Sequence, residues 1–274
     1  MKRLRMILAL TVGLMIALAG CSPPVAVRPA VVCATIKPIA LIVQAIAGSA
    51  VQVSVLANDG GVPLQNAHDL AAASTVVFES GTSFDAWASN IVPENVRLVN
   101  LSVASDKSMS GSPWLSLHYA ADMARTVRDT LDIAYPRMKD QFDSRYAAFL
   151  SQSSQADGQL KKLIWNAHTR ACLAEDATWS RGAADFGLRV VVQPGLKGLD
   201  LSGTQAAAQV KEWGSVDKTM VVIVNVNAAE DTGVDRLANG IVVCRLDAFG
   251  VTARGDFVLW LEHQLETLGL AMES

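Results

Sequence analysis

The sequence predicts an α/β protein of two doubly wound α/β lobes, joined by a long helix, with a ligand cleft between the lobes. Strand patterns alternate with helix patterns in both halves of the chain, which is typical of parallel sheets covered by helices. The two halves read alike on either side of one amphipathic helix that begins near Leu117. With 51% hydrophobic and 18% charged residues, the 274-residue chain has the composition of a globular protein with a sizeable core.

The first residues predict a signal peptide. Three basic residues precede an apolar run, 6–18, which is too short to remain in a bilayer as a spanning helix. The next residues, Leu18-Ala19-Gly20-Cys21, resemble the lipobox of bacterial lipoproteins, in which the cysteine is lipidated and becomes the first mature residue. We therefore expect a signal peptide at 1–20, lipidation at Cys21 and a tether at 21–29. A plain secretory signal is the alternative.

The N-terminal lobe is predicted to cover residues 30–113. The continuous apolar run 30–35 indicates a strand buried on both faces. The following segment, 38–47, indicates a helix with proline in its first turn. Further along, the pattern indicates strands at 51–56, 75–78 and 96–101, and helices at 67–73 and 84–91.

The linking helices are predicted at 114–168. From Leu117 to Leu131, apolar residues recur at helical spacing with charged residues largely on the other side. Pro136 ends or kinks this helix, because the residue before a proline is pushed out of the helical region. Helical spacing then resumes as far as Trp165.

The C-terminal lobe is predicted at 169–274, where the alternation of strands and helices begins again. Strands are expected at 171–174, 188–193, 220–226 and 241–246, and helices at 178–186, within 203–214, at 231–239 and at 255–268. Each lobe thus has about four strands. In such folds the default ligand site is the cleft at the carboxyl ends of the strands.

Charge and motifs exclude several functional classes. A net charge of -3, with scattered Lys and Arg, gives no basic surface for nucleic acid. No serine lies in a Gly-x-Ser-x-Gly elbow, and Gly195-Leu196-Lys197-Gly198 lacks the remaining P-loop positions, so we expect no enzyme. The three remaining cysteines lie in apolar runs and are expected to be buried, although a disulfide is allowed outside the cytoplasm: Cys33, Cys172 and Cys244.

Four segments carry a resemblance to a known family: Ala34–Ile39 (ATIKPI), Gly81–Trp87 (GTSFDAW), Leu131–Leu150 and Asp247–Gly250 (DAFG). They are similar to the opening strand and helix, the glycine-to-tryptophan segment, the proline-broken helical connection and the Asp-Pro-Leu-Gly turn of the solute-binding lipoproteins of bacterial zinc and manganese ABC importers. The resemblance implies a monomer, lipid-anchored at the cell envelope and facing the periplasm or the exterior, that delivers its cargo to a membrane permease.

The resemblance also implies a divalent metal, zinc or manganese, held between the lobes by three histidines and one carboxylate, or by two of each. Most of these ligands are replaced here. Leu64 falls at or beside the first histidine position, Ser112 at the second, and Asp176, next to Glu175, at the third, while Asp247 is retained.

We therefore predict a variant, carboxylate-rich metal site built from Asp247, Asp176, Glu175, Ser112 and His68. His68 follows the shortened turn and could replace the lost histidine, or it could be a surface residue at the start of a helix. Such a site would suit a harder cation, such as manganese, calcium or magnesium, better than zinc. The alternative is a family member that binds no metal and acts as a structural or interaction lipoprotein, or binds another small solute.

The other histidines are weaker candidates. His118 lies in the first turn of the central helix and could contribute if that turn faces the cleft. His168 and His263 are expected at the surface.

Overall fold

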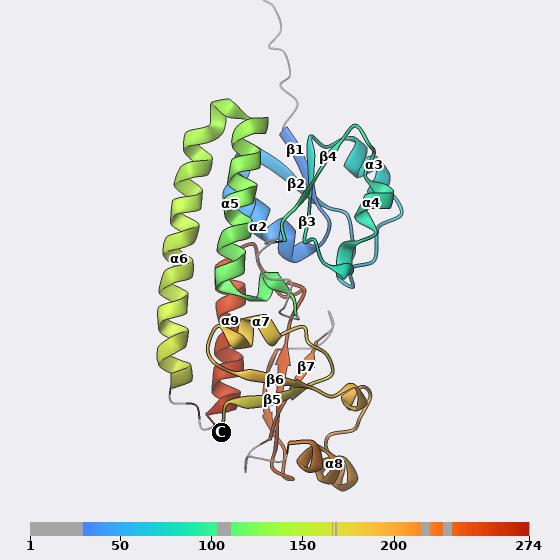
Figure 1. Cartoon of the computed structure of the whole chain (residues 1–274), viewed down its shortest axis with the longest axis vertical. Coiled ribbons are helices and arrows are strands. Elements are labelled where there is room, and N and C mark those ends of the chain that lie inside the picture. The colour runs from blue at the N-terminus through green and yellow to red at the C-terminus, as the bar shows by residue number, and fades with distance from the viewer. Residues whose placement is uncertain are drawn as a thin grey trace, which may run out of the picture.

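In the computed structural model, two sheets are stacked along one side of a pair of long helices (Figure 1). The structure describes residues 30–102, 111–165, 167, 169–214, 220–226 and 232–273. The predicted signal peptide, the lipidation site Cys21, the tether and His168 lie outside the described residues. Within the described residues, no helix is both long and apolar enough to cross a membrane.

The N-terminal sheet is four-stranded and parallel, with the order β2-β1-β3-β4. Its strands are β1 (Ala30–Ala34), β2 (Val51–Val55), β3 (Val76–Glu79) and β4 (Arg97–Asn100). Its helices are α2 (Lys37–Ala47), α3 (Ala67–Ala72) and α4 (Ala88–Ile91), with short 3₁₀ turns at Gly48–Ala50 and Ser83–Asp85. The central strand β1 ends in fully buried residues, as expected of a strand covered on both faces.

The long helices follow from local signals in the sequence. After a 3₁₀ turn at Pro113–Leu115, the Ser116 hydroxyl caps α5 (Leu117–Ala134) by accepting a hydrogen bond from the Tyr119 amide. At Tyr135, directly before Pro136, the backbone leaves the helical region with φ of −135°. After a second 3₁₀ turn, Pro136–Met138, α6 (Lys139–Trp165) runs back alongside α5 (Figure 1).

The C-terminal sheet is five-stranded, with the order β6-β5-β7-β9-β8. Its strands are β5 (Ala171–Ala174), β6 (Arg189–Val192), β7 (Met220–Asn225), β8 (Gly233–Arg236) and β9 (Ile241–Leu246). Its helices are α7 (Ser180–Ala184), α8 (Thr204–Gly214) and α9 (Phe257–Met272), with a 3₁₀ turn at Pro194–Leu196. All neighbouring strands are parallel except β8, which is antiparallel to β9.

The helix predicted at 231–239 is wrong, because its described residues form strand β8 of a hairpin with β9. The turn carries Asn239 and Gly240, and the glycine has a left-handed φ of 83°. Across the pair, Asp235 forms an ion pair with Arg245 at 2.5 Å. An Asn-Gly pair between two apolar runs is a strong hairpin signal, and it outweighed the helical spacing of the apolar residues.

One hydrophobic core runs through both lobes. It extends from Val32 in β1, through Val127 in α5 and Phe149 in α6, to Leu246 in β9. The opposite face of each sheet packs on a smaller cluster, which includes Leu56 and Val77 in the N-terminal lobe and Val210 and Val222 in the C-terminal lobe. Each sheet is thus covered on both faces, which confirms the predicted fold of two doubly wound α/β lobes and a long helix.

Candidate functional site

The predicted C-terminal ligands lie at one edge of the C-terminal sheet. Glu175 and Asp176 directly follow β5, and Asp247 directly follows β9. Ser112 is brought to the same edge, because its backbone N–H donates to the carbonyl of Thr178 at 3.0 Å. Strand β7 lies between β5 and β9, so the two carboxylate-bearing loops start about 10 Å apart, two strand spacings.

The space between these two loops is partly taken by a pair of side chains that the sequence analysis did not connect. Asn225, at the end of β7, accepts a hydrogen bond at 2.8 Å from the indole N–H of Trp179. Trp179 is 1% exposed. The pair therefore fixes the end of the central strand between the predicted ligands.

Asp247 is completely buried, and its carboxylate is held by four donors from its own lobe. Oδ1 accepts from the amide of Phe249 at 3.0 Å. Oδ2 accepts from the amide and hydroxyl of Thr252, at 2.7 and 2.8 Å, and from the indole of Trp260 at 3.2 Å. The backbone N–H of Asp247 donates to Gln264 at 2.8 Å. These contacts tie the loop after β9 to helix α9.

The two carboxylates after β5 are much more accessible. Asp176 is exposed and accepts the amide of Thr178 at 2.8 Å, so it closes a tight turn. Glu175 forms an ion pair with Lys197 at 3.3 Å, and both side chains are substantially exposed. An exposed ion pair of this kind contributes little to stability, which leaves Glu175 available to other partners.

The histidines lie apart from this edge. The exposed His68 on α3 has its Nδ1 2.9 Å from the carbonyl of Ile91, at the end of α4. His118 and His263 are exposed on α5 and α9. Among the described residues, no three His, Cys, Asp or Glu side chains gather in a group suited to a metal ion. The ligand roles of Asp247, Asp176, Glu175, Ser112 and His68 stay predictions.

A buried carboxylate in the N-terminal lobe was missed by the sequence analysis. Asp85 is completely buried at the ends of β1 and β3. Its Oδ2 accepts from the hydroxyl of Thr35 at 2.5 Å and the amide of Ser80 at 2.6 Å, and its Oδ1 accepts from the hydroxyl of Ser80 at 2.7 Å. Burial, and the nearby charge of Asp85, raise the pKa of Glu79. The signal was present in GTSFDAW, but its hydroxyl partner Thr35 is 50 residues away.

Aromatic side chains join the two lobes. Phe84 of the N-terminal lobe packs on Phe249 of the C-terminal lobe, with ring centroids 4.6 Å apart. Trp114 lies 6.1 Å from Phe84 and 6.2 Å from Phe249, is completely buried, and donates its indole N–H to the carbonyl of Ala248 at 2.9 Å. Lys37 of α2 adds a hydrogen bond across the lobes, from Nζ to the carbonyl of Val251 at 3.1 Å.

Asp185, which directly follows α7, is a further half-buried carboxylate, and it lies near the start of α5 in space. Its Oδ2 accepts the hydroxyl proton of Ser116 at 2.6 Å, which places a negative charge near the N-terminus of α5. Burial raises the pKa of Asp185, and the Ser116 hydrogen bond partly offsets this rise. Asp185, His118 and Asp157 line one pocket of about 440 Å³.

The three described cysteines, Cys33, Cys172 and Cys244, are free and buried. Burial raises the pKa of Cys172 to about 12 and also raises the pKa of Cys244. These thiols are therefore protonated at neutral pH and suited to packing rather than to metal binding, which requires the thiolate.

Comparison with known proteins identifies the family. The family model of the zinc-uptake complex component A, periplasmic (ZnuA), matches residues 32–271. A zinc-bound ZnuA with residues 138–173 deleted has a TM-score of 0.70 and 18% identity, and the match covers 90% of this chain and 99% of that one. No curated protein matches the chain.

Two further solved structures share the fold. The zinc-bound ZnuA-like domain of Streptococcus pneumoniae AdcA has a TM-score of 0.72 and 17% identity, with 90% of this chain and all of that chain covered. The metal-dependent lipoprotein YcdH of Bacillus subtilis has a TM-score of 0.73 and 12% identity, with 89% and 100% covered. The chain therefore belongs to the periplasmic zinc-uptake component A family, whose members are metal-binding, substrate-binding proteins of ABC importers and not enzymes.

Proposed function

We propose that this protein is the lipid-anchored solute-binding component of a metal-type ABC importer, with a variant, carboxylate-rich site between its lobes. The family match over 32–271 supports the importer role, and Leu18-Ala19-Gly20-Cys21 supports the anchor. The single observation that carries the site is the hydrogen bond from Ser112 to Thr178, because it joins the second predicted ligand position to the turn bearing Asp176.

The donor set favours a hard divalent cation over zinc. Carboxylate and hydroxyl oxygens are the ligands of manganese, calcium and magnesium, whereas zinc prefers imidazole and thiolate. In this proposal Asp176 and Glu175 supply accessible carboxylates, and Asp247 offers Oδ1, which has a single protein donor. Ser112 and His68 complete the proposed ligand set, and His68 would have to leave the carbonyl of Ile91 to take part.

Thermal unfolding of the protein lacking residues 1–20 tests the metal site. A cation that binds only the folded state, at 100 times its Kd, stabilises it by about 2.7 kcal/mol. We expect stabilisation by manganese or calcium, lost in Asp176→Asn and kept in the matched control Glu94→Gln, an exposed carboxylate of the N-terminal lobe. Asp176 is the better target, because changing Asp247 would also disrupt its four internal hydrogen bonds.

A second candidate, a family member that binds no metal, is favoured by the ring contact between Phe84 and Phe249. In this case the aromatic side chains, rather than an ion, hold the lobes together. Absence of stabilisation by saturating zinc, manganese and calcium would select this candidate. Co-purification of an importer permease with the membrane-bound protein would still support a role in transport.

The lipid anchor is tested separately. Cys21→Ser should move the protein from the membrane fraction to the soluble fraction, because it removes the thiol to which the lipid is proposed to be attached. An unchanged distribution would instead favour the plain secretory signal.

A further inference from the structure

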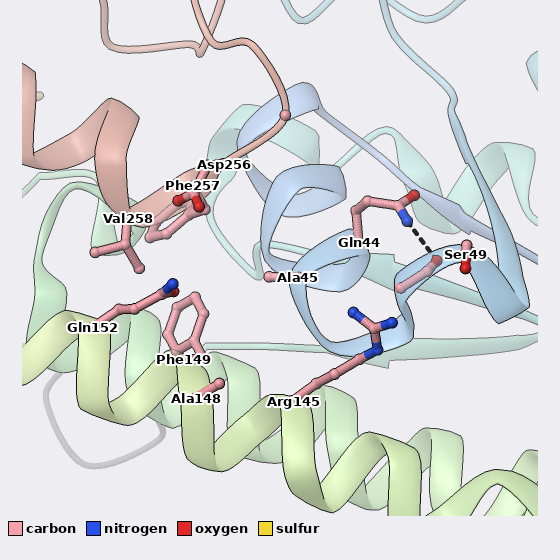
Figure 2. Close-up of a pocket in the computed structure, with 12 residues that line it drawn as sticks. Gln44, Ala45, Ser49, Arg145, Ala148, Phe149, Gln152, Asp256, Phe257 and Val258 are labelled. Carbon is pink, nitrogen blue, oxygen red and sulfur yellow. Dashed lines mark hydrogen bonds between the residues drawn. The ribbon is translucent and has the colours of Figure 1, made fainter.

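A pocket of about 480 Å³ lies where the two lobes and the linking helix meet, away from the predicted metal ligands. Its walls come from the end of α2, the middle of α6 and the first turn of α9 (Figure 2). The volume is within the range of small-molecule sites. None of the residues assigned to the inter-lobe site lines it.

One end of the pocket carries the cation of Arg145. Within the described part of the chain, its guanidinium forms no hydrogen bond or ion pair. It lies against Gly48, where a Cβ would overlap the guanidinium, and Gly48 also has a left-handed φ of 61°. The end of α2, whose dipole favours a cation, therefore positions Arg145 without using its donors. A guanidinium fork of this kind matches the two oxygens of a carboxylate.

The opposite end carries a negative charge. Asp256 caps α9, with Oδ1 accepting from the amide of Leu259 at 3.0 Å, and its carboxylate faces the same pocket. Figure 2 shows Asp256, beside Phe257 and Val258, and Arg145, near Gln44 and Ser49, on different sides of the group of lining side chains. A ligand that is anionic at both ends would be repelled by Asp256, whereas one with an ammonium at that end would be attracted.

The middle of the pocket is lined by both apolar and polar side chains. The rings of Phe149 and Phe257, with centroids 5.8 Å apart, line the pocket but are almost completely buried, so the accessible apolar lining comes mainly from Ala45 and Ala148. The amide of Gln152 lies beside Phe149 (Figure 2), and Gln44 lines the far side while donating to the carbonyl of Gly48 at 2.5 Å. A ligand that fits this arrangement has charged ends, a polar backbone and a modest apolar side chain.

We propose that this pocket binds a small zwitterionic amino-carboxylate of about dipeptide size. Its carboxylate pairs with Arg145, its ammonium faces Asp256 and its apolar side chain packs against Ala45 and Ala148. Because the walls come from both lobes and from α6, the bound molecule would hold all three parts together. This inference is independent of the proposed metal site.

Calorimetric titration of the mature chain tests the proposal with three probes: the dipeptide Ala-Leu, its C-terminal amide and its N-acetyl derivative. We expect the dipeptide to bind and each masked probe to bind at least about tenfold more weakly, since each lacks one charged hydrogen-bonding end. Equal binding of all three probes, or no binding of the dipeptide, would overturn the proposal. Binding of inorganic phosphate without the dipeptide would reduce the site to an adventitious anion only and also overturn it.

Matched variants assign the binding to this pocket. Arg145→Gln removes the cation, and Arg137→Gln is its control, an exposed arginine outside the pocket. Asp256→Asn removes the negative charge but keeps a good helix cap. Ala148→Leu leaves every polar group in place and puts a larger side chain into the pocket from an exposed helix position. It should therefore abolish binding without unfolding the protein. Wild-type affinity in both Arg145→Gln and Ala148→Leu, with unchanged circular dichroism, would refute the assignment.

Discussion

The two lobes each bury one carboxylate at the carboxyl edge of their parallel strands, but they hold it differently. Asp85 relies on the hydroxyls of Thr35 and Ser80 and on one amide, so side chains from two strands converge on it. Asp247 relies mainly on its own loop and on the indole of Trp260 from α9. Of these two buried carboxylates, the resemblance to importer proteins assigns a ligand role only to Asp247, yet the hydrogen bonds of both hold loops in place.

The largest effect is expected from removing the carboxylate of Asp247. Asp247→Ala leaves the buried Trp260 indole without an acceptor and also removes the acceptor of the Phe249 amide and of the Thr252 amide and hydroxyl, which should reduce the free energy of unfolding by about 4 kcal/mol. Urea unfolding measures the loss, and Asp176→Ala, in the exposed turn, should cost about 0.5 kcal/mol. Equal losses in the two variants would contradict a structural role for Asp247.

The contact between the lobes gives the next largest effect. Phe84→Ala removes a ring that is 40% exposed but packs on Phe249 and Trp114. We therefore expect the free energy of unfolding to fall by about 2 kcal/mol. The change should also increase the radius of gyration in small-angle scattering if these rings hold the lobes together. The exposed Leu270→Ala on α9 is the control for loss of apolar surface away from the interface.

Single hydroxyl deletions sharpen the comparison between the lobes. Thr35→Val removes one of three donors to Asp85, whereas Thr252→Val removes one of four to Asp247 and leaves the Thr252 amide in place. In urea unfolding we expect the free energy of unfolding to fall by about 1.5 kcal/mol in Thr35→Val and by about 1 kcal/mol in Thr252→Val. The reverse order would show that the N-terminal carboxylate is less dependent on its hydroxyl partners.

The smallest effect concerns the pH dependence contributed by Asp185. Its folded-state pKa is raised above the ordinary value of 3.8, so the folded protein binds this proton more tightly than the unfolded chain. The resulting stabilisation is present below pH 3.8 and is lost as the pH rises through the raised pKa. Asp185→Asn should therefore gain stability relative to wild type over that interval, as measured by thermal unfolding at several pH values. A constant difference across the interval would contradict the raised pKa.

Periodicity in the sequence was sufficient to predict most of the fold. Alternation and helical spacing identify elements such as β1 and α5 because each buries one defined face or stripe. The helix predicted at 231–239 is wrong because the Asn239-Gly240 turn specifies a hairpin between β8 and β9. The two helices on either side of Pro136 separate the two alternating patterns, so the extent of each lobe along the chain is predicted as well.

The site was less accessible to prediction, because it depends on pairs of residues that are distant in sequence. The predicted strands before Asp176 and Asp247 are confirmed, and both residues lie where parallel sheets carry ligands, but their ligand roles stay predictions. Counting from motifs says nothing about contacts between distant residues. It could not reveal that Thr35 and Asp85 meet, or that Phe84 packs on Phe249. These contacts result from how strand ends and whole lobes are arranged, and no local pattern specifies that arrangement.

The shared hydrophobic core has a consequence for how the chain can be divided. Residues of β1, α5, α6 and β9 belong to one continuous cluster, so neither sheet closes its inner face alone. A truncated protein with only one lobe would expose that apolar face to water, and we expect it to aggregate. The two halves share an order of elements, yet each needs the other and the linking helices to bury its inner face.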